Sequence, residues 1–426
     1  MKLAIVSALA AALLLSAPPA QARTPAAAAT EQLGINKRQI DAALAGMLSS
    51  GRAVGVSALV WQNGHEAYYG QQGLADREAN RPWSRDTLVQ IFSMTKPVTG
   101  VALMQLWEQG KFRLDDPLHL YLPEFANMRV QDGVDAEGKP KWRAVARPIT
   151  IRDVMRHTAG FSYGFGATPA DAEFRQANPL ALTNNLSEFG QKLASVPLIA
   201  EPGREWHYSA AVDVQALLVE KLSGQVFADY VAQHIFTPLQ MKDSGWHQPM
   251  DRLPRLAIGY QKGADGKLVR VPDAQLLAMN FPGSRMTMGG AGIVAPIDDY
   301  MRFARMLLNG GELDGARILK PATVRLMATN QLDPAITERE WLPGKVDGGF
   351  GLDFAVRTRQ PSSPKMNRGA VGEFFWDGMA STLFWVDPAN NLAAVFFVQA
   401  LPFDGTLHTD IRKAVYGAEY LGPPGD

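Results

Sequence analysis

The chain of 426 residues contains no cysteine. This absence excludes disulfide bonds, a thiol nucleophile and lipid attachment through a cysteine. An excess of either charge is also missing, because Lys plus Arg and Asp plus Glu each total 42. A chain balanced in this way gives no indication of a nucleic acid or an anionic membrane as its partner. We therefore expect no nucleic-acid binding.

Long apolar runs are missing after the N-terminal segment, so we expect no stable membrane insertion. Motifs such as H-E-x-x-H, a P-loop, or G-x-G-x-x-G after a strand are absent too. The 7 histidines are scattered along the chain. We expect neither a metal ion nor a cofactor. The sequence predicts no particular oligomeric state.

The N-terminal segment MKLAIVSALAAALLLSAPPAQA combines one lysine, an apolar run and small residues. Ala20-Gln21-Ala22 matches an A-x-A cleavage site, so residues 1–22 are predicted to be a signal peptide that is removed after Ala22. A retained membrane anchor is disfavoured because the apolar run is short for a bilayer span. The mature protein, residues 23–426, is therefore expected to be periplasmic or secreted.

Strand patterns occur near both ends of the chain. Residues 56–70 alternate around Asn63-Gly64, a dipeptide that favours a two-residue hairpin. Strand-rich stretches follow Gly348, with a second hairpin turn expected at 387–391. These patterns predict one sheet built from the two ends of the chain.

Helical patterns occupy much of the remaining sequence. They begin at Val98 and recur over 151–157, 211–222, 298–308 and about 408–420. The fold class is therefore α/β (α+β). We expect one subdomain from about 33–115 and 286–426, and an inserted, mainly helical subdomain from about 116–285.

Residues 160–164 read GFSYG and match G-x-S-x-G, the nucleophile elbow of the α/β-hydrolases. An elbow needs a strand before its serine and a helix after it. Here a helix capped by Thr150 and stopped at Gly160 is expected before Ser162, and a loop is expected at 165–174. Because the order is reversed, Ser162 is not expected to be the nucleophile.

A better candidate lies in FSMTKPVTG, where Ser93 and Lys96 stand one turn apart at the start of a predicted helix. A neutral lysine amine can activate the serine hydroxyl. Burial and the positive end of the helix dipole both lower the pKa of such a lysine. A second S-x-x-K match at 362–365 lies in a polar loop with no helix behind it, so the context favours Ser93.

Further stretches line up in order: EPGREWHYSAAVDVQALLVEKLSG (201–224), GGAGIVAPIDDYMRFARMLLNGG (289–311) and GEFFWDGMASTLFWVDP (372–388). Together with FSMTKPVTG and IRDVMRHTAGF, they make the chain resemble the serine β-lactamase-like family. That family includes class C β-lactamases, D-Ala-D-Ala peptidases and family VIII carboxylesterases. The resemblance covers nearly all of the mature chain. It implies a β-lactamase/DD-peptidase-like fold, in which helices flank an antiparallel sheet.

The resemblance also implies a role for each matching residue. Ser93 would be the acylated nucleophile and Lys96 its activating partner. Tyr208 would carry a proton to the leaving group, provided that cations such as Lys96 depress its pKa. The backbone N–H groups of Ser93 and Met379 would form the oxyanion hole. In isolation, a tyrosine before a helix more often serves packing, so the order of the motifs carries this assignment.

Two departures from the family pattern concern the substrate. Ala210 replaces the asparagine of Y-x-N, and Trp376-Asp377-Gly378 replaces K-T-G. The lysine and threonine that would bind a substrate carboxylate are therefore absent, and an anionic Asp377 would repel it. Trp376 would instead offer a flat apolar wall to a neutral ester. Family VIII esterases commonly carry Trp-Gly-Gly here, which makes the resemblance to them closest.

The sequence therefore predicts an exported carboxylesterase that cleaves a small-molecule ester, with a short acyl chain, through a Ser93 acyl-enzyme. One alternative is a β-lactamase or D-Ala-D-Ala peptidase with atypical carboxylate recognition. A second is a catalytically weak binding protein on a penicillin-recognition fold. A third is an α/β-hydrolase that uses Ser162 with a later histidine.

Overall fold

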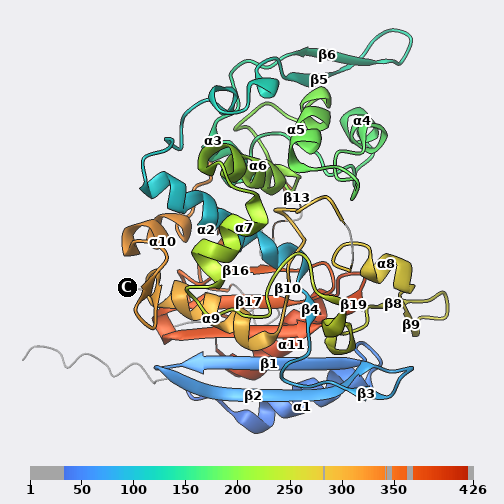
Figure 1. Cartoon of the computed structure of the whole chain (residues 1–426), viewed down its shortest axis with the longest axis vertical. Helices are drawn as coiled ribbons and strands as arrows, with labels where there is room; N and C mark the ends of the chain where they lie inside the picture. The colour runs from blue at the N-terminus through green and yellow to red at the C-terminus, as the bar shows by residue number, and fades with distance from the viewer. Residues whose placement is uncertain (1–32, 282–283, 341, 343–347, 362–367, 421–426) are drawn as a thin grey trace, which may run out of the picture. The chain divides into compact units, whose positions relative to one another are not determined.

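Strand pairing joins the two ends of the chain into one sheet. The computed structural model describes residues 33–281, 284–340, 342, 348–361 and 368–420. In the described part, eight strands follow the order β14-β15-β16-β17-β18-β1-β2-β3. Each of their pairings is antiparallel. Figure 1 shows the first strands in blue beside the last in red. The predicted α/β fold with an antiparallel sheet from both chain ends is confirmed.

The strands of this sheet are β1 (Gly55–Gln62), β2 (His65–Asp76), β3 (Arg81–Pro82), β14 (Gly348–Phe350), β15 (Ala355–Arg357), β16 (Phe374–Asp377), β17 (Leu383–Asp387) and β18 (Leu392–Val398). Shorter strands elsewhere are β4 (Val89–Gln90), β5 (Arg129–Val134), β6 (Pro140–Ala144), β7 (Trp206–His207), β8 (Tyr260–Lys262), β9 (Leu268–Arg270), β10 (Val294–Ala295), β11 (Glu312–Leu313), β12 (Ala316–Arg317), β13 (Arg339–Glu340) and β19 (Ala400–Leu401).

Both predicted hairpins are present. Asn63 and Gly64 join β1 to β2 with φ values of 51° and 83°, as a type I′ turn requires. The second turn joins β17 to β18, where the Asp387 side chain accepts a hydrogen bond from the backbone of Asn390. Asn391 then takes a φ of 46°.

The helices are α1 (Lys37–Ser49), α2 (Thr95–Glu108), α3 (Ile151–Met155), α4 (Pro169–Ala177), α5 (Leu186–Ser195), α6 (Ala211–Ser223), α7 (Phe227–Val231), α8 (Asp273–Leu277), α9 (Ile297–Leu308), α10 (Pro321–Met327) and α11 (Gly405–Tyr416). Consecutive residues of β17 point to opposite faces of the sheet. Phe384 meets Tyr300 of α9 with ring centroids 5.1 Å apart, and Trp385 meets Tyr416 of α11 at 6.4 Å. Helices α9 and α11 therefore cover opposite faces.

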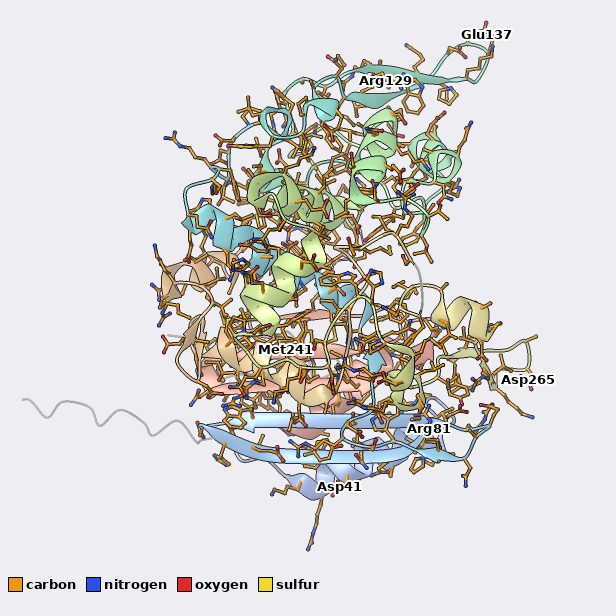
Figure 2. All side chains as sticks on the ribbon, in the orientation of Figure 1. Asp41, Arg81, Arg129, Glu137, Met241 and Asp265 are labelled. Carbon is orange, nitrogen blue, oxygen red and sulfur yellow. The ribbon has the colours of Figure 1, made fainter. Side chains whose placement is uncertain are left out.

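The segment from 116 to 285 contains α3 to α8 and short strands (Figure 1). Thr150 caps α3 as predicted, because it accepts the Asp153 N–H in a capping box. The helix ends earlier than expected, at Met155. His157, with a φ of 56°, takes the left-handed conformation that follows the helix end, whereas Gly160, with a φ of 84°, lies further along the loop. Figure 2 shows Glu137 and Asp265 at the tips of the β5–β6 and β8–β9 hairpins.

The loop predicted at 165–174 is wrong in part, since α4 begins at Pro169. Thr168 and Asp171 form a capping box there, and proline is well tolerated in the first turn. Two other predictions, the signal peptide at 1–22 and the second S-x-x-K at 362–365, lie outside the described residues. In the part that is described, no helix has both the length and the apolar character needed to cross a bilayer.

Candidate active site

Ser93 stands on a strained turn that leads directly into α2. The turn is a 3₁₀ helix over Phe92–Met94, and α2 begins at Thr95. Phe92 has a φ of 44°, which is rare for a bulky residue and costs conformational energy. Strain of this kind persists where the surrounding structure holds one side chain in a required position. In this turn, the strained conformation of Phe92 holds the Ser93 hydroxyl at the start of α2.

Lys96 is the side chain that approaches Ser93 from α2. Its Nζ lies 3.0 Å from Ser93 Oγ and 2.7 Å from the carbonyl oxygen of Gly290. The side chain is only 1% exposed. Burial lowers the pKa of Lys96 to about 8, although nearby carboxyl groups, Asp213 first among them, act to raise it. This confirms the predicted direction, and a sizeable neutral fraction is present near pH 8.

The Gly290 carbonyl is held in place by hydrogen bonds between its segment and the start of α2. The Ile293 N–H donates to Thr95 Oγ1 at 3.1 Å, and Thr99 Oγ1 donates to the Gly289 carbonyl at 2.7 Å. Strands β4 and β10 pair just beyond these contacts. The GGAG stretch, which in isolation suggests only a turn, therefore supplies an acceptor that orients the Lys96 amine.

Tyr208 completes a cluster around the serine hydroxyl. Its OH donates to Ser93 Oγ at 2.7 Å. The ring packs among other rings, with centroid distances of 5.1 Å to His157, 5.4 Å to Tyr163 and 5.5 Å to Trp376. The structure thus brings Ser93, Lys96 and Tyr208 together.

The condition stated for the role of Tyr208, a pKa depressed by nearby cations, is not met. Burial among the aromatic rings raises the pKa of Tyr208 well above its usual value, and the Asp377 carboxylate raises it further. The Lys96 amine lies 4.6 Å from the centroid of the tyrosine ring, and its charge does not offset this desolvation. The raised pKa keeps the Tyr208 phenol protonated, so it donates a hydrogen bond to Ser93 Oγ and cannot act as a resting base.

Gly378 brings the end of β16 against the serine turn. A side chain there would put its Cβ only 2.5 Å from the Ile91 carbonyl oxygen, so only glycine allows this approach. The next residue, Met379, has an exposed side chain. Among the described residues, its backbone N–H has no hydrogen-bond acceptor. That N–H is free to bind an incoming oxyanion.

Trp376 does not form the open wall predicted from the sequence. It is only 2% exposed and packs against Tyr208 and Phe350, with centroid distances of 5.5 and 5.4 Å. The alternation along β16 turns it toward the aromatic cluster behind Tyr208. In this structure Trp376 packs against the Tyr208 ring and helps to hold it in place.

Asp377 points to the other face of β16, toward α11. Its carboxylate lies 4.0 Å from His408 Nδ1, and its side chain is 17% exposed. Burial raises the pKa of Asp377 to about 7, while Lys96 and Arg412 act to lower it. The carboxyl group is therefore only partly ionised near neutral pH, and its predicted repulsion of a substrate carboxylate is weaker than a fixed charge would give.

Asp213 is a site residue that the sequence analysis missed. Its Oδ1 accepts the Gly290 N–H at 3.1 Å, and its Oδ2 has no partner among the described residues. Burial raises its pKa to about 6, so the group is largely ionised at neutral pH. A Cβ on Gly290 would lie 2.9 Å from Asp213 Oδ2 and 3.3 Å from Lys96 Nζ, which places both groups around that glycine. A carboxylate among the apolar residues of the first turn of α6 was the available signal.

Ser162, the serine of the elbow-like motif, has structural partners. It is 1% exposed, donates to Asp171 Oδ1 at 2.6 Å and accepts the Gly164 N–H at 2.6 Å. Its backbone carbonyl accepts the Ala210 N–H at 3.3 Å, two residues after Tyr208. Ser162 thus links the start of α4 to the loop that carries Tyr208 through hydrogen bonds.

Comparison with known proteins finds relatives along most of the chain. The family model described as Beta-lactamase matches residues 40–417. Protein Rv1367c of Mycobacterium tuberculosis is 33% identical over 384 residues, covering 88% of this chain and 90% of the relative. Esterase EstB of Burkholderia gladioli is 29% identical over 398 residues, covering 89% and 94%. The solved structure of EstCE1, a hydrolase with promiscuous acyltransferase activity, matches with a TM-score of 0.74 and 25% identity, covering 89% of this chain and 98% of that one.

Proposed function

This chain belongs to the Beta-lactamase family, and from that premise we propose that it is a serine carboxylesterase of the family VIII type. The observation that carries the proposal is the pair of contacts on Ser93 Oγ, 3.0 Å from Lys96 Nζ and 2.7 Å from Tyr208 OH. A base and a neutral acid on one hydroxyl are what acyl transfer through a serine requires. Esterase EstB, a relative along most of the chain, supports the same class of reaction.

Acylation begins with the neutral amine of Lys96. It takes the proton of the Ser93 hydroxyl as Oγ bonds to the ester carbonyl carbon. The carbonyl oxygen becomes an oxyanion, which the N–H groups of Ser93 and Met379 bind. Hydrogen-bond donors of this kind contribute about 10²–10³-fold each to the rate.

Collapse of this intermediate breaks the bond to the alcohol oxygen. Tyr208 donates its proton to that oxygen and regains one from the Lys96 ammonium, so the alcohol leaves neutral. Water then attacks the acyl-enzyme and gives its proton to Lys96. The acid leaves and Ser93 Oγ regains its proton, which restores the starting state.

Residues around the serine favour esters over β-lactams. The lysine and threonine that would bind a β-lactam carboxylate are replaced by Trp376 and Asp377. The buried tryptophan carries no charge, and the ionised fraction of Asp377 repels an anion. Neither Trp376 nor Asp377 can replace the positive charge of the missing lysine.

A direct comparison of two chromogenic substrates tests the proposal. We expect kcat/KM for p-nitrophenyl butyrate to exceed that for a chromogenic cephalosporin by at least about tenfold, the equivalent of one lost charge-assisted contact. Faster turnover of the cephalosporin would instead establish a β-lactamase. Turnover of neither, with no labelling of Ser93 by a fluorophosphonate, would leave a binding protein.

A further inference from the structure

A small cavity opens next to the serine turn. It has a volume of about 150 Å³ and is lined in part by Phe92, which precedes Ser93, and by Met379, whose N–H is the second oxyanion donor of the proposed mechanism. Lys96 and Tyr208 are not among its lining residues. Ser93 is not a lining residue either, so the cavity adjoins the serine turn through Phe92 and Met379, on a side that the proton-transfer groups do not occupy.

The wall of this cavity is apolar although several glutamines border it. Val271 and Leu276 are buried side chains of the wall. The Gln90 side chain donates to the Leu276 carbonyl at 2.9 Å, and that of Gln399 donates to the Gln90 carbonyl at 3.0 Å. Because the amide donors of Gln90 and Gln399 are satisfied within the protein, these two side chains do not call for a polar ligand. The third glutamine, Gln275, is exposed.

Gly259 keeps the cavity open. A Cβ on this residue would lie 3.3 Å from Val271 Cγ2 and 3.8 Å from Leu276 Cδ1, so any larger side chain would project into the space between them. Met279, partly buried, closes another part of the wall. The volume is therefore set by a glycine and by a flexible methionine, two positions at which single substitutions change it.

The chemistry proposed above fixes which part of the ester faces this space. Three substituents surround the carbonyl carbon: the oxygen, the alcohol and the acyl chain. The oxygen must lie at the Met379 and Ser93 N–H groups, and the alcohol must lie at Tyr208, which gives it a proton. Only the acyl chain is left for the side formed by Phe92 and Met379.

We propose that this cavity is the acyl pocket and that the preferred substrates are esters with an apolar acyl group of about the size of a benzene ring. An apolar cavity of this volume accommodates benzene in another protein, so a hexanoyl or benzoyl group fits and a long fatty acyl chain does not. This inference rests on the proposed esterase function and adds to it the substrate class.

The test uses the p-nitrophenyl esters of acetate, butyrate, hexanoate and octanoate, which share one alcohol. In the wild type, kcat/KM should rise by up to about fourfold per methylene as far as hexanoate, and then stop rising. Met279→Trp fills the cavity and should lower the hexanoate-to-acetate ratio by about tenfold or more. Met279→Ala enlarges it and should move the optimum toward octanoate. Met250→Trp, at an exposed position outside the cavity, is the matched control and should leave the ratio unchanged.

The inference is overturned if both Met279 variants keep the wild-type chain-length profile. It is also overturned if they change selectivity along a series of acetate esters with larger alcohols, because the cavity would then hold the alcohol. Thermal melting identifies a variant that fails to fold, in which case the other variant decides. Hydrolysis that survives Ser93→Ala would refute the proposed function itself, whereas Ser93-dependent hydrolysis with an unaltered acyl profile refutes only the pocket.

Discussion

At the scale of single residues, the surroundings of Lys96 and Tyr208 decide which of the two the proposed mechanism uses as its base. Lys96 and Tyr208 both contact Ser93 Oγ, and Lys96 is buried while Tyr208 is partly buried. Desolvation moves their pKa values in opposite directions. Desolvation favours the neutral form of each group, so the lysine becomes an available base and the tyrosine an available acid. The motifs Ser-x-x-Lys and Tyr-x-Ala pointed to both residues. The direction in which the Tyr208 pKa shifts could not be predicted from the sequence. It depends on the aromatic cluster around Tyr208, whose members come from distant parts of the chain.

The first prediction concerns pH. Only the neutral amine of Lys96 can accept the Ser93 proton, so kcat/KM should rise about tenfold per unit at low pH and level off above about pH 8, the pKa of Lys96. Initial rates on a p-nitrophenyl ester between pH 5 and 9.5, corrected for spontaneous hydrolysis, measure this profile. A rate that is flat from pH 6 to 9 would remove Lys96 as the base.

The second prediction concerns Asp213. Its carboxylate stabilises the Lys96 ammonium, so Asp213→Asn should lower the lysine pKa and move the rising limb of the profile to lower pH. The amide oxygen can still accept the Gly290 N–H, which keeps the loop in place. At pH 6.5 the variant should show a several-fold larger fraction of its plateau rate. Asp298→Asn, at an exposed ion pair with Arg85, is the control. A limb that stays at its wild-type position contradicts the assignment.

At the scale of elements, close backbone approach decides the geometry of the site. The hairpins, α2, α6 and α9 could be predicted from periodicity, turn residues and caps. The contacts between 289–295 and α2, and between Gly378 and Ile91, could not, because they join segments far apart in the sequence. The helix α4 was missed because its short turn pattern also fits a loop. Its capping box uses Asp171, the residue that also holds Ser162.

Gly378 provides the third prediction. In Gly378→Ala the new methyl would meet the Ile91 carbonyl and Thr382 Oγ1 and push the Met379 N–H away from the serine turn. A displacement of about 1 Å at a reacting centre costs on the order of 10²-fold in rate. We expect kcat/KM to fall by that order, measured beside a thermal melt of the same sample.

The control for this variant is Gly46→Ala in α1, where nothing lies within 4 Å of the added methyl. It should leave kcat/KM unchanged and add up to about 1 kcal/mol of stability. If Gly378→Ala kept full activity, the end of β16 would not position the oxyanion donor.

At the scale of the whole molecule, the sheet connects the start of the chain to its end. The C-terminal helix α11 is held on one face of the sheet by a buried polar network. Arg412 donates to Glu373 at 2.7 Å, and the Tyr416 hydroxyl donates to Asp387 at 2.7 Å. The order of the strand patterns predicted one sheet from the two ends. This network could not be predicted, because charged residues on a terminal helix usually face solvent.

Arg412 carries the fourth prediction. Arg412→Ala leaves Glu373 as a buried carboxylate without its main partner, and should lower the free energy of unfolding by about 3–5 kcal/mol. Urea denaturation measures this loss. Arg52→Ala breaks an ion pair of the same length, 2.7 Å, to Asp410 of the same helix, where both side chains are partly exposed. That control should cost about 0–1 kcal/mol. Equal losses in the two variants would show that burial of the Glu373 pair is unimportant.

The identity of the nucleophile is the central claim, and hydrolysis of p-nitrophenyl butyrate by Ser93→Ala and Ser162→Ala tests it most directly. Ser93→Ala should lose at least about 10³-fold in kcat, because the other members of such a unit achieve little without the nucleophile. Ser162→Ala removes two buried hydrogen bonds and should cost about 1–3 kcal/mol of stability, while its folded fraction keeps kcat within about tenfold. The reverse outcome, a folded Ser162→Ala without activity beside an active Ser93→Ala, would contradict the account.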